Sequence, residues 1–301
     1  MSDYPQRAVT GRRIIVTGAT NGIGKEIARA LVRRGAAVTI LARNATKAEA
    51  TARELADEDG AAATPEVVLA DLSDLASVRT AAAELARRYD RIDVLVNNAG
   101  IHSIPAESSG DGYELMMATN HLGPFLLTNS LLPQLESGTQ PRIVVTASEA
   151  HRMWPRVDLA EFAEPARYSP VGSLFAYARS KLMNILFTQE LARRLTSTPL
   201  TVNSFCPGMV ASGLTRDSGI LTTATRALSR TPLVRTPQQG AAMGIRLVLD
   251  ATLTDSTGHF FSSTPGAHLL PPVRIRNDEP LQRRAWDRSA ELVGLASGES
   301  R

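Results

Sequence analysis

Short runs of β-branched and aliphatic residues recur along the chain, and most are followed by a longer segment in which apolar residues return every three or four positions. The short runs have the composition of buried strands, and the longer segments have the period of amphipathic helices. The expected strands are residues 12–17, 37–41, 66–70, 92–96, 142–146, 200–205 and 259–261. Because strands alternate with helices, the sequence predicts an α/β fold, a doubly wound parallel sheet with helices on both faces, formed by residues 1–301 as a single domain.

The helices expected around these strands are residues 45–58, 74–89, 112–135, 173–187, 237–249 and 278–295. A further helix should follow the first strand, where Ile27 and Leu31 carry the apolar period. Asp74 is expected to cap the helix that it precedes. Trp286 is expected to anchor the polar helix 278–295 to the core.

One polar residue stands inside the mostly apolar helix expected over 112–135. Asn120 has Leu122, Phe125 and Leu126 as neighbours. A mid-helix Asn usually faces solvent or bonds locally. These apolar neighbours instead indicate that the Asn120 side chain lies inside the protein.

Two long segments lack a helical or strand period, residues 151–172 and 209–236. Long irregular segments in a compact domain are commonly functional loops. Residues 209–236 are rich in Ser, Thr and Gly, and they follow Pro207 and Gly208 at the end of an expected strand. We therefore expect residues 209–236 to act as a substrate lid that is more mobile than the sheet.

A glycine-rich turn lies between the first strand and the first helix. Glycines in such a turn permit a tight reversal and a close approach of the backbone to a pyrophosphate, which the helix N-terminus then holds. The spacing differs from the common G-x-G-x-x-G, so its weight comes from the order of strand, turn and helix. The turn residues expected at a dinucleotide are Gly18, Thr20, Asn21, Gly22, Ile23 and Gly24.

The second strand is followed by Ala42, Arg43 and Asn44. In a dinucleotide-binding fold this strand end meets the adenosine ribose, where an Asp or Glu accepts from the 2′-hydroxyl of NAD. This chain has no acid at these positions. The Arg43 guanidinium can instead bind a 2′-phosphate, with Asn44 donating beside it, so the sequence predicts NADP (NADPH) as the cofactor.

Asp71 and Leu72 follow the third strand. Asp71 has two interpretations, since its carboxylate can hold a turn or can contact an adenine ring. Asp71 and Leu72 are both candidates for cofactor binding.

Residues 173–187 contain an ionisable pair that suits chemistry, Tyr177 and Lys181. Helix residues four apart lie on one face, so the phenol and the ammonium should be neighbours. A nearby cation favours the phenolate, and we expect Lys181 to lower the pKa of Tyr177 and make it a general acid. With five Tyr and three Lys in the chain, this spacing would arise by chance in roughly one such sequence in twenty.

Composition adds few constraints. The 33 basic and 30 acidic residues give a formal net charge of +3 and are spread along the chain, so we expect no nucleic-acid partner. The single cysteine, Cys206, excludes an internal disulfide and suits a reducing compartment. The N-terminal residues lack the apolar core of a signal peptide, and no run reaches the roughly eighteen apolar residues of a membrane span. We expect a cytoplasmic protein without a membrane anchor.

Several separated motifs occur in the order that one family keeps: Thr17 to Gly24, Asn97 to Gly100, Asn120, Ser148, Tyr177 with Lys181, and Pro207 with Gly208. On these motifs the chain resembles the short-chain dehydrogenases/reductases over essentially its whole length. The Asn97 to Ile101 and Ala176 to Leu182 runs, the insertion before Tyr177 and the Arg283 to Leu295 ending are similar to the retinol dehydrogenase and WW-domain oxidoreductase branch. The resemblance implies a Rossmann-like domain that interconverts a carbonyl and an alcohol with NADP.

The resemblance also implies a role for each motif. Tyr177 would transfer a proton at the carbonyl oxygen while hydride moves between the nicotinamide and the carbonyl carbon. Lys181 would lower the pKa of Tyr177 and hold the nicotinamide ribose, Ser148 would hydrogen-bond the substrate oxygen, and Asn120 would hold a water of a proton relay. Other cofactor contacts are implied for the three turn glycines at the pyrophosphate, Asn97 by the adenosine ribose, Pro207 with Gly208 at the nicotinamide, and Ala99, Gly100 and Val210.

Two departures from that branch bear on the substrate. The sequence shows no N-terminal membrane anchor of the kind found in many retinol dehydrogenases, and the Thr frequent after Pro207-Gly208 is absent, with Ser212 nearby instead. A retinoid substrate is therefore in question, and we expect a small-molecule ketone, aldehyde or alcohol.

Two other functions remain open. One is reduction of a C=C bond, as in the related protochlorophyllide reductases. The other is a catalytically idle protein that binds a dinucleotide or a partner, because fold does not fix function. An idle protein could lose Tyr177, Lys181 or Ser148 without penalty, and all three are present.

Two histidines and one pair of helices carry further expectations. His102 and His151 follow candidate motifs and could line a substrate site, but the simpler expectation is that each is a solvated loop residue. The helices around Tyr177 and over 112–135 are apolar on more than one face, which suits a homodimer or homotetramer. The insertion 151–172 could cover that face instead.

Overall fold

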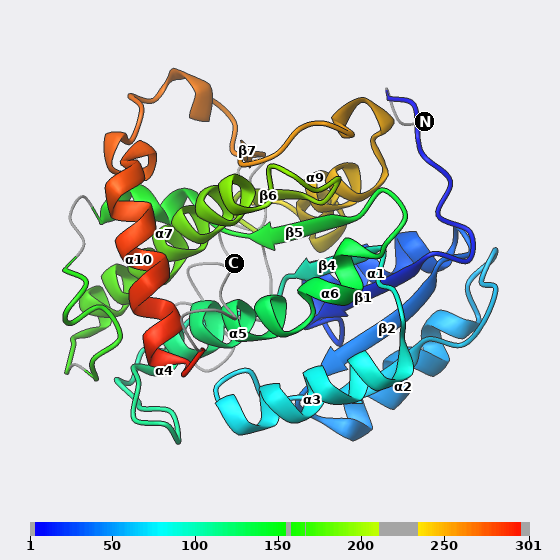
Figure 1. The fold of residues 1–301 in the computed structure, drawn as a ribbon, viewed down its shortest axis with the longest axis horizontal. Coiled ribbons are helices and arrows are strands. Elements are labelled where there is room, and N and C mark those ends of the chain that lie inside the picture. The colour runs from blue at the N-terminus through cyan, green and yellow to red at the C-terminus, as the bar shows by residue number, and fades with distance from the viewer. Residues whose placement is uncertain (1–3, 155–157, 166, 211–233, 296–301) are drawn as a thin grey trace.

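The computed structural model describes residues 4–154, 158–165, 167–210 and 234–295 (Figure 1). Its centre is a sheet of seven parallel strands in the order β3-β2-β1-β4-β5-β6-β7. The strands are β1 Arg13–Thr17, β2 Ala37–Ala42, β3 Glu66–Leu69, β4 Val94–Asn97, β5 Arg142–Thr146, β6 Thr201–Cys206 and β7 Phe260–Ser262. The predicted doubly wound parallel sheet is confirmed, and each strand lies within two residues of its expected ends.

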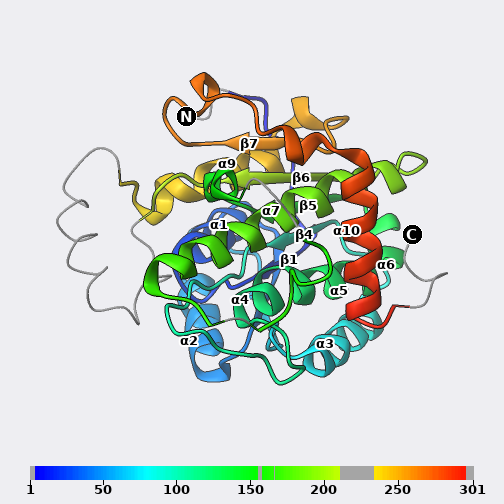
Figure 2. The same ribbon diagram turned by 90° about the vertical axis from the view of Figure 1, so that its left-hand side faces the viewer.

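Helices cover both faces of the sheet (Figure 2). One face is covered by α1 Gly22–Val32, α2 Ala45–Ala56 and α9 Pro237–Leu249. The other is covered by α3 Leu75–Arg88, α5 Gly123–Ser130 and α7 Pro170–Arg194. Asp74 caps α3 as predicted, its carboxylate accepting from the backbone N–H groups of Ala76 and Ser77. The helix that carries Tyr177 is longer than predicted, and its first turn replaces the last residues of the expected 151–172 loop.

The single helix predicted over 112–135 is wrong in detail. The chain instead forms α4 Leu115–Met117, the π-helix η1 Ala118–Leu122, α5, and α6 Leu132–Glu136. Prolines explain the interruptions, because a proline has no N–H to donate to the carbonyl four residues earlier. Pro124 has no N–H to donate to the Asn120 carbonyl. The preceding turn is wider than an α-helical turn, and in it the Gly123 N–H donates to the carbonyl of Ala118. Pro133 similarly lies just after the break at Leu131.

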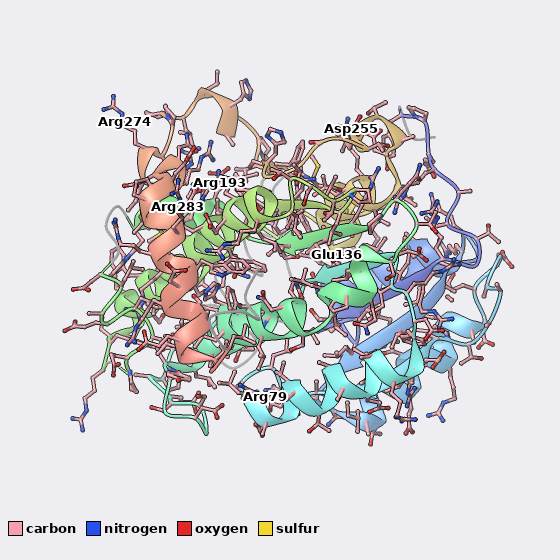
Figure 3. All side chains as sticks on the ribbon, in the orientation of Figure 1. Arg79, Glu136, Arg193, Asp255, Arg274 and Arg283 are labelled. Atoms are coloured by element: carbon pink, nitrogen blue, oxygen red, sulfur yellow. The ribbon has the colours of Figure 1, made fainter. Side chains whose placement is uncertain are left out.

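Charged side chains are distributed over many elements (Figure 3). The labelled examples come from α3, α6, α7, α10 and the segments around β7. This distribution agrees with the even spread of charge along the sequence. Among the described residues, none of the helices combines the length and apolar character needed to cross a bilayer, and no group of three or more His, Cys, Asp or Glu side chains could hold a metal ion.

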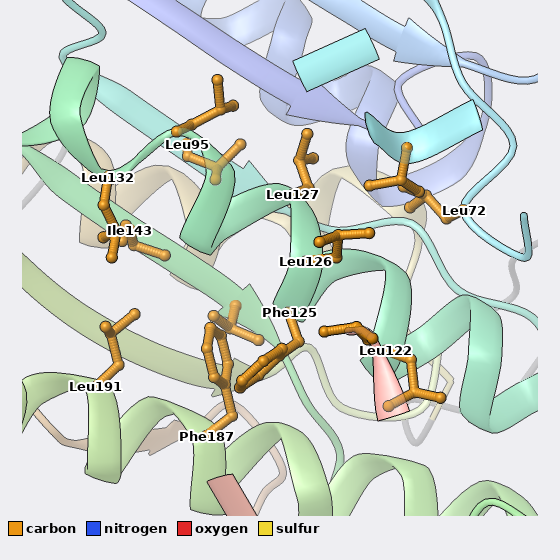
Figure 4. Close-up of a cluster of buried hydrophobic side chains, with 14 of the residues drawn as sticks. Leu72, Leu95, Leu122, Phe125, Leu126, Leu127, Leu132, Ile143, Phe187 and Leu191 are labelled. Carbon is orange, nitrogen blue, oxygen red and sulfur yellow. The ribbon is translucent and has the colours of Figure 1, made fainter. Parts of the chain in front are cut away.

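The larger core lies between the sheet and the α3–α5–α7 layer (Figure 4). Phe125 and Phe187 face one another across α5 and α7, with ring centroids 5.4 Å apart. The last helix, α10 Glu279–Leu292, lies over both helices (Figure 1). Its Trp286 is 2% exposed and packs 4.8 Å from the Phe125 ring and 5.8 Å from the Phe187 ring. The expectation that Trp286 anchors this helix is confirmed.

Replacing Trp286 by Ala should lower the free energy of unfolding by about 3–5 kcal/mol, because the change leaves a large cavity between α10 and the core. Urea denaturation followed by circular dichroism would measure the loss. Trp286→Phe is the matched control: it keeps a ring and removes an indole N–H that is buried without a partner in the described structure, so its loss should be much smaller. Equal losses in the two variants would contradict this account of the anchor.

The two irregular segments differ in how far they can be described. Between 151 and 172 the chain packs Phe162 and Ala163 into the core, and the Ala163 carbonyl accepts from the Glu114 N–H. The expected lid, 209–236, falls mostly on residues 211–233, which lie outside the described part. Its two ends are adjacent, since Val210 and Arg235 form a parallel bridge.

Short 3-10 helices complete the described structure. They are η2 Glu149–Met153, η4 Ala251–Leu253, η5 Ala267–Leu269 and η6 Arg274–Asn277.

Candidate active site

The parallel sheet brings the motifs together at one edge, because all seven strands end on the same side. β1 and β4 are neighbours near the centre of the sheet, and the strand order runs outward in opposite directions from them. The crevice at such a switch point is where open α/β sheets bind their ligands. The segments that end there are Thr17–Gly18, Asn97–Gly100, Thr146–Ser148 and Cys206–Gly208.

The glycine-rich turn has the shape of a phosphate cradle. Gly18 adopts φ +67°, and a Cβ added to it would lie 2.8 Å from the Ala99 Cα. A Cβ on Gly24 would lie 2.5 Å from the Gly18 carbonyl oxygen, so both positions require glycine. Asn21 caps α1 by accepting from the Gly22 N–H, and the helix N-terminus therefore opens at the end of β1. These residues fit a dinucleotide pyrophosphate.

The remaining residues of this turn lie on either side of it. Thr20 is partly exposed in the turn, and Ile23 is partly buried on the first turn of α1. A Cβ on Gly240 of α9 would lie 3.3 Å from the Ile23 side chain, so α9 supports this end of α1.

The two adjacent asparagines after β4 have different surroundings. Asn97 is 3% exposed, and its amide donates to the Thr128 hydroxyl on α5. Its side chain therefore points into the core, and only its backbone remains a candidate for the adenosine ribose. Asn98 is the one beside the glycine turn, where its amide donates to the Thr17 carbonyl. Asn98 was not among the site residues predicted from the sequence.

Thr17 is a second residue that sequence reasoning missed. Its hydroxyl accepts from the backbone N–H groups of Asn98 and Ala99, both at 2.9 Å. Thr17 thereby ties the end of β1 to the turn after β4 and fixes Ala99 and Gly100 beside Gly18. A threonine at a strand end is too common for sequence alone to assign it this role.

The side chains of Arg43 and Asn44 lie exposed just after β2. Arg43 is exposed, and within the described residues its guanidinium has no hydrogen-bond or ion-pair partner. Asn44 caps α2 by accepting from the Lys47 N–H, which leaves its NH₂ group as a donor. Both side chains are available to a ligand at this strand end.

At the end of β3, Asp71 holds a turn. Its carboxylate accepts from the Ser73 N–H at 2.9 Å and from the Ser73 hydroxyl at 2.6 Å. The turn interpretation is therefore observed, and contact with an adenine stays a prediction. Leu72 is buried in the core, and its carbonyl oxygen would lie 2.1 Å from a Cβ on Gly123, so contact of Leu72 with the cofactor stays a prediction.

Tyr177 and Ser148 meet at the end of β5. Ser148 is the N-cap of η2, and its side chain interacts with the Tyr177 phenol. Burial raises the pKa of Tyr177, and its hydrogen bond to Ser148 acts in the opposite direction. The predicted lowering of the Tyr177 pKa by Lys181 is thus wrong for the protein alone, because burial dominates and Lys181 is not among the groups that shift this pKa.

Lys181 is 2% exposed and lies 5.5 Å from the centroid of the Tyr177 ring. Its ammonium donates to the Thr146 carbonyl at 3.1 Å, which supplies a partner for a buried charge. Burial lowers the pKa of Lys181 to about 8. The predicted pairing on one helix face is confirmed, with the cation beside the ring.

Asn120 is buried, as predicted, within the π-helix η1. Its amide oxygen accepts from the Ile101 N–H at 2.8 Å, and its NH₂ group donates to the Ile101 carbonyl and to Ser180, both at 3.0 Å. A Cβ on Gly100 would lie 3.2 Å from the Asn120 amide oxygen and 3.3 Å from the Lys181 ammonium. Gly100 therefore lets Asn120 and Lys181 approach. A water held by Asn120 stays a prediction.

The turn after β6 closes the site. Gly208 adopts φ +81°, and its N–H donates to the buried sulfur of Cys206. The same sulfur accepts from the Glu149 N–H, so Cys206 connects the Pro207–Gly208 turn to the loop that carries Ser148. Val210 is partly buried where the turn meets Arg235.

The expectation that His102 and His151 are solvated is wrong. His151 is completely buried, its Nδ1 lies 2.7 Å from the Ser148 carbonyl, and its ring contacts Phe260. His102 is half-buried and lies edge-on to the Tyr177 ring, with centroids 5.4 Å apart. Burial lowers the pKa of both histidines. Their positions directly after the two motifs were the only sequence signal.

Comparison with known proteins agrees with this geometry. Residues 12–157 match the family model for short chain dehydrogenase. Mouse retinol dehydrogenase 14 is 36% identical over 95% of this chain and 86% of its own length, and human retinol dehydrogenase 12 is 37% identical over 95% and 87%.

Solved structures are also similar to this chain. An uncharacterized protein of Mycobacterium paratuberculosis is 33% identical with a TM-score of 0.74, covering 97% of this chain and 96% of that one. A protein of Escherichia coli described as a short chain dehydrogenase complexed with NADPH is 26% identical with a TM-score of 0.67, covering 87% and 100%. The chain belongs to the short-chain dehydrogenase/reductase family, in the branch that contains the retinol dehydrogenases.

Proposed function

We propose that the protein is an NADP-dependent oxidoreductase that interconverts an aldehyde or ketone with the corresponding alcohol. The observation that carries this proposal is the convergence of Ser148, Tyr177 and Lys181 at the sheet edge that also holds the Gly18–Gly24 turn. An acid, a hydrogen-bond donor and a dinucleotide cradle are the parts that carbonyl reduction requires.

A nicotinamide dinucleotide, when bound, supplies or accepts the hydride. The protein's own residues handle the oxygen of the substrate. Tyr177 donates its phenolic proton to the carbonyl oxygen during reduction and recovers it from the alcohol during oxidation. Ser148 donates a hydrogen bond to the same oxygen, and the Lys181 cation stabilises the phenolate that Tyr177 becomes. Burial raises the pKa of Tyr177, so the phenol is protonated in the protein alone and has a proton to donate.

The dinucleotide would be held along the sheet edge. The backbone N–H of Ile23, on the first turn of α1, would bind the pyrophosphate, whereas the Gly22 N–H already donates to the Asn21 side chain. Arg43 and Asn44 would bind the 2′-phosphate of NADP, and the related E. coli protein was solved with NADPH.

For the substrate we propose an apolar alcohol–aldehyde pair, the class to which retinol and retinal belong. Several curated relatives are named retinol dehydrogenases. The first turns of α7, just before Tyr177, also expose Val171, Leu174 and Phe175, which share one side of the helix. Large apolar side chains exposed together commonly mark a binding surface.

The proposal is tested by following NADPH oxidation with retinal, other apolar aldehydes, steroid ketones and an α,β-unsaturated ketone. We expect turnover with one or more apolar carbonyls and an allylic alcohol as the product of the unsaturated ketone. A saturated ketone product would instead support C=C reduction. NADPH binding without any turnover would support the idle alternative.

We also propose that the protein is a monomer, because α10 covers the faces of α5 and α7 that suit self-association, with Trp286 packed on Phe125 and Phe187. Light scattering at micromolar concentration should give the mass of one chain, 32.3 kDa. A dimer or tetramer mass would mean that another surface pairs the subunits. The cytoplasmic location stays a prediction.

A further inference from the structure

His102 contacts the proposed general acid and is outside the set of residues assigned to catalysis above. It follows Ile101, whose backbone N–H and carbonyl are both bonded by Asn120. The loop that carries His102 is therefore clamped to η1 directly before the imidazole. The position of the His102 ring is therefore set by the buried Asn120 side chain, which holds the backbone just before it.

The imidazole is also fixed at its far end, by Ser173. The Ser173 hydroxyl donates its one hydrogen to the Pro170 carbonyl at 2.6 Å, so it can only accept from His102 Nε2, at 3.2 Å. This assigns the Nε2–H tautomer to His102. Burial lowers the pKa of His102, so the ring is neutral at neutral pH.

Ser173 and Tyr177 are one turn apart on α7, and the imidazole spans both. The His102 and Tyr177 rings cross at 73° with centroids 5.4 Å apart, the edge-to-face arrangement that aromatic pairs favour. The Tyr177 ring also contacts the Lys181 ammonium, and the Tyr177 hydroxyl is hydrogen-bonded to Ser148. His102 is thus the contact that restrains the ring from the side of the loop after β4.

We propose that His102 is a positioning residue that fixes the Tyr177 ring, so that the phenol points at the substrate oxygen beside Ser148. This inference rests on the proposed function, because it assigns the phenol its catalytic task. A displacement of the phenol by about 1 Å can cost about a hundredfold in rate, so loss of this contact should affect kcat.

Three substitutions separate the two contacts of the imidazole. His102→Ala removes both, His102→Phe keeps a ring against Tyr177, and His102→Asn keeps an N–H donor for Ser173 without the ring. We expect kcat for NADPH-dependent reduction of retinal or another apolar aldehyde to fall about 10- to 100-fold in the Ala and Asn variants. The Phe variant should recover most of the loss, and the KM for aldehyde and the Kd for NADPH should change by less than about threefold, because neither ligand is held by His102.

A second readout does not depend on turnover. In protein with ¹³C-labelled tyrosine, the Tyr177 signal can be assigned by its absence from Tyr177→Phe. Without cofactor, its ring should lose order in His102→Ala and His102→Asn and keep it in His102→Phe.

The outcomes are distinct. The inference is overturned if His102→Ala keeps kcat within twofold of wild type and ring order is unchanged. It is also overturned if Asn rescues and Phe does not, because His102 would then bind the substrate directly. Wild-type protein that turns over no carbonyl would contradict the proposed function and not the inference about His102. The ring-order measurement would still decide the role of His102. Melting temperatures of all three variants identify a folding defect, and Ser173→Ala then tests the chain of contacts without altering the ring.

Discussion

Tyr177→Phe should reduce turnover about 10²- to 10⁴-fold, the range expected for loss of a positioned general acid. The substitution removes the phenolic oxygen and keeps the ring that packs against His102 and Lys181. Fold and cofactor binding should therefore survive, because neither depends on the hydroxyl. Steady-state kinetics with NADPH and an apolar aldehyde, together with the Kd for NADPH, measure both halves of the expectation.

A matched control for this variant is Tyr168→Phe. Tyr168 lies just before α7, the helix that carries Tyr177, and its hydroxyl donates to the buried Glu114 carboxylate. The control should lose some stability and little activity. If Tyr177→Phe kept activity within threefold of wild type, Tyr177 would not be the acid.

Arg43→Ala should erase most of a preference for NADPH over NADH that we expect to be one to two orders of magnitude. The expectation follows from a charge-assisted hydrogen bond worth about 1.5–3 kcal/mol between the guanidinium and the 2′-phosphate. Arg43 is exposed, and in the described structure it has no protein partner that would have to be broken. The ratio of kcat/KM for the two cofactors measures the preference before and after substitution.

NADH kinetics should hardly change in Arg43→Ala, since NADH has no phosphate for this side chain to bind. Arg53→Ala is the matched control, because Arg53 is an exposed arginine on α2 that should leave the cofactor ratio unaltered. A wild-type enzyme that uses NADH as well as NADPH, or an Arg43→Ala variant that discriminates as before, would show that NADP is not selected by this residue.

Local patterns in the sequence were sufficient for the sheet, because each strand is a short β-branched run and each helix has its own apolar period. Local patterns did not predict the π-helix around Asn120. Its position depends on which carbonyl has no N–H donor because Pro124 is part of the helix. They also could not choose between Asn97 and Asn98. Side chains alternate between faces along a strand, so the choice depends on where β4 ends and on the face that α5 covers.

The electrostatics of the site were the least accessible to sequence reasoning. The spacing of Tyr177 and Lys181 correctly placed a cation beside a phenol, but the sign of the net pKa shift depends on burial by distant segments. The same applies to His102 and His151, whose burial comes from Ser173 and Phe260, residues about 70 and 110 positions away in the sequence. Contacts between distant segments, and not propensity, decide these properties.

Transfer of deuterium from the 4-position of NADPH tests the central claim most directly, since it reports which atom of the substrate receives the hydride. With 4-deuterated NADPH of each stereochemistry and an α,β-unsaturated aldehyde or ketone that the enzyme accepts, the account predicts an allylic alcohol with deuterium on the carbinol carbon from one of the two cofactors. Mass spectrometry and NMR of the product locate the label. Deuterium on the β-carbon of a saturated carbonyl product would contradict the assignment of this site to carbonyl reduction.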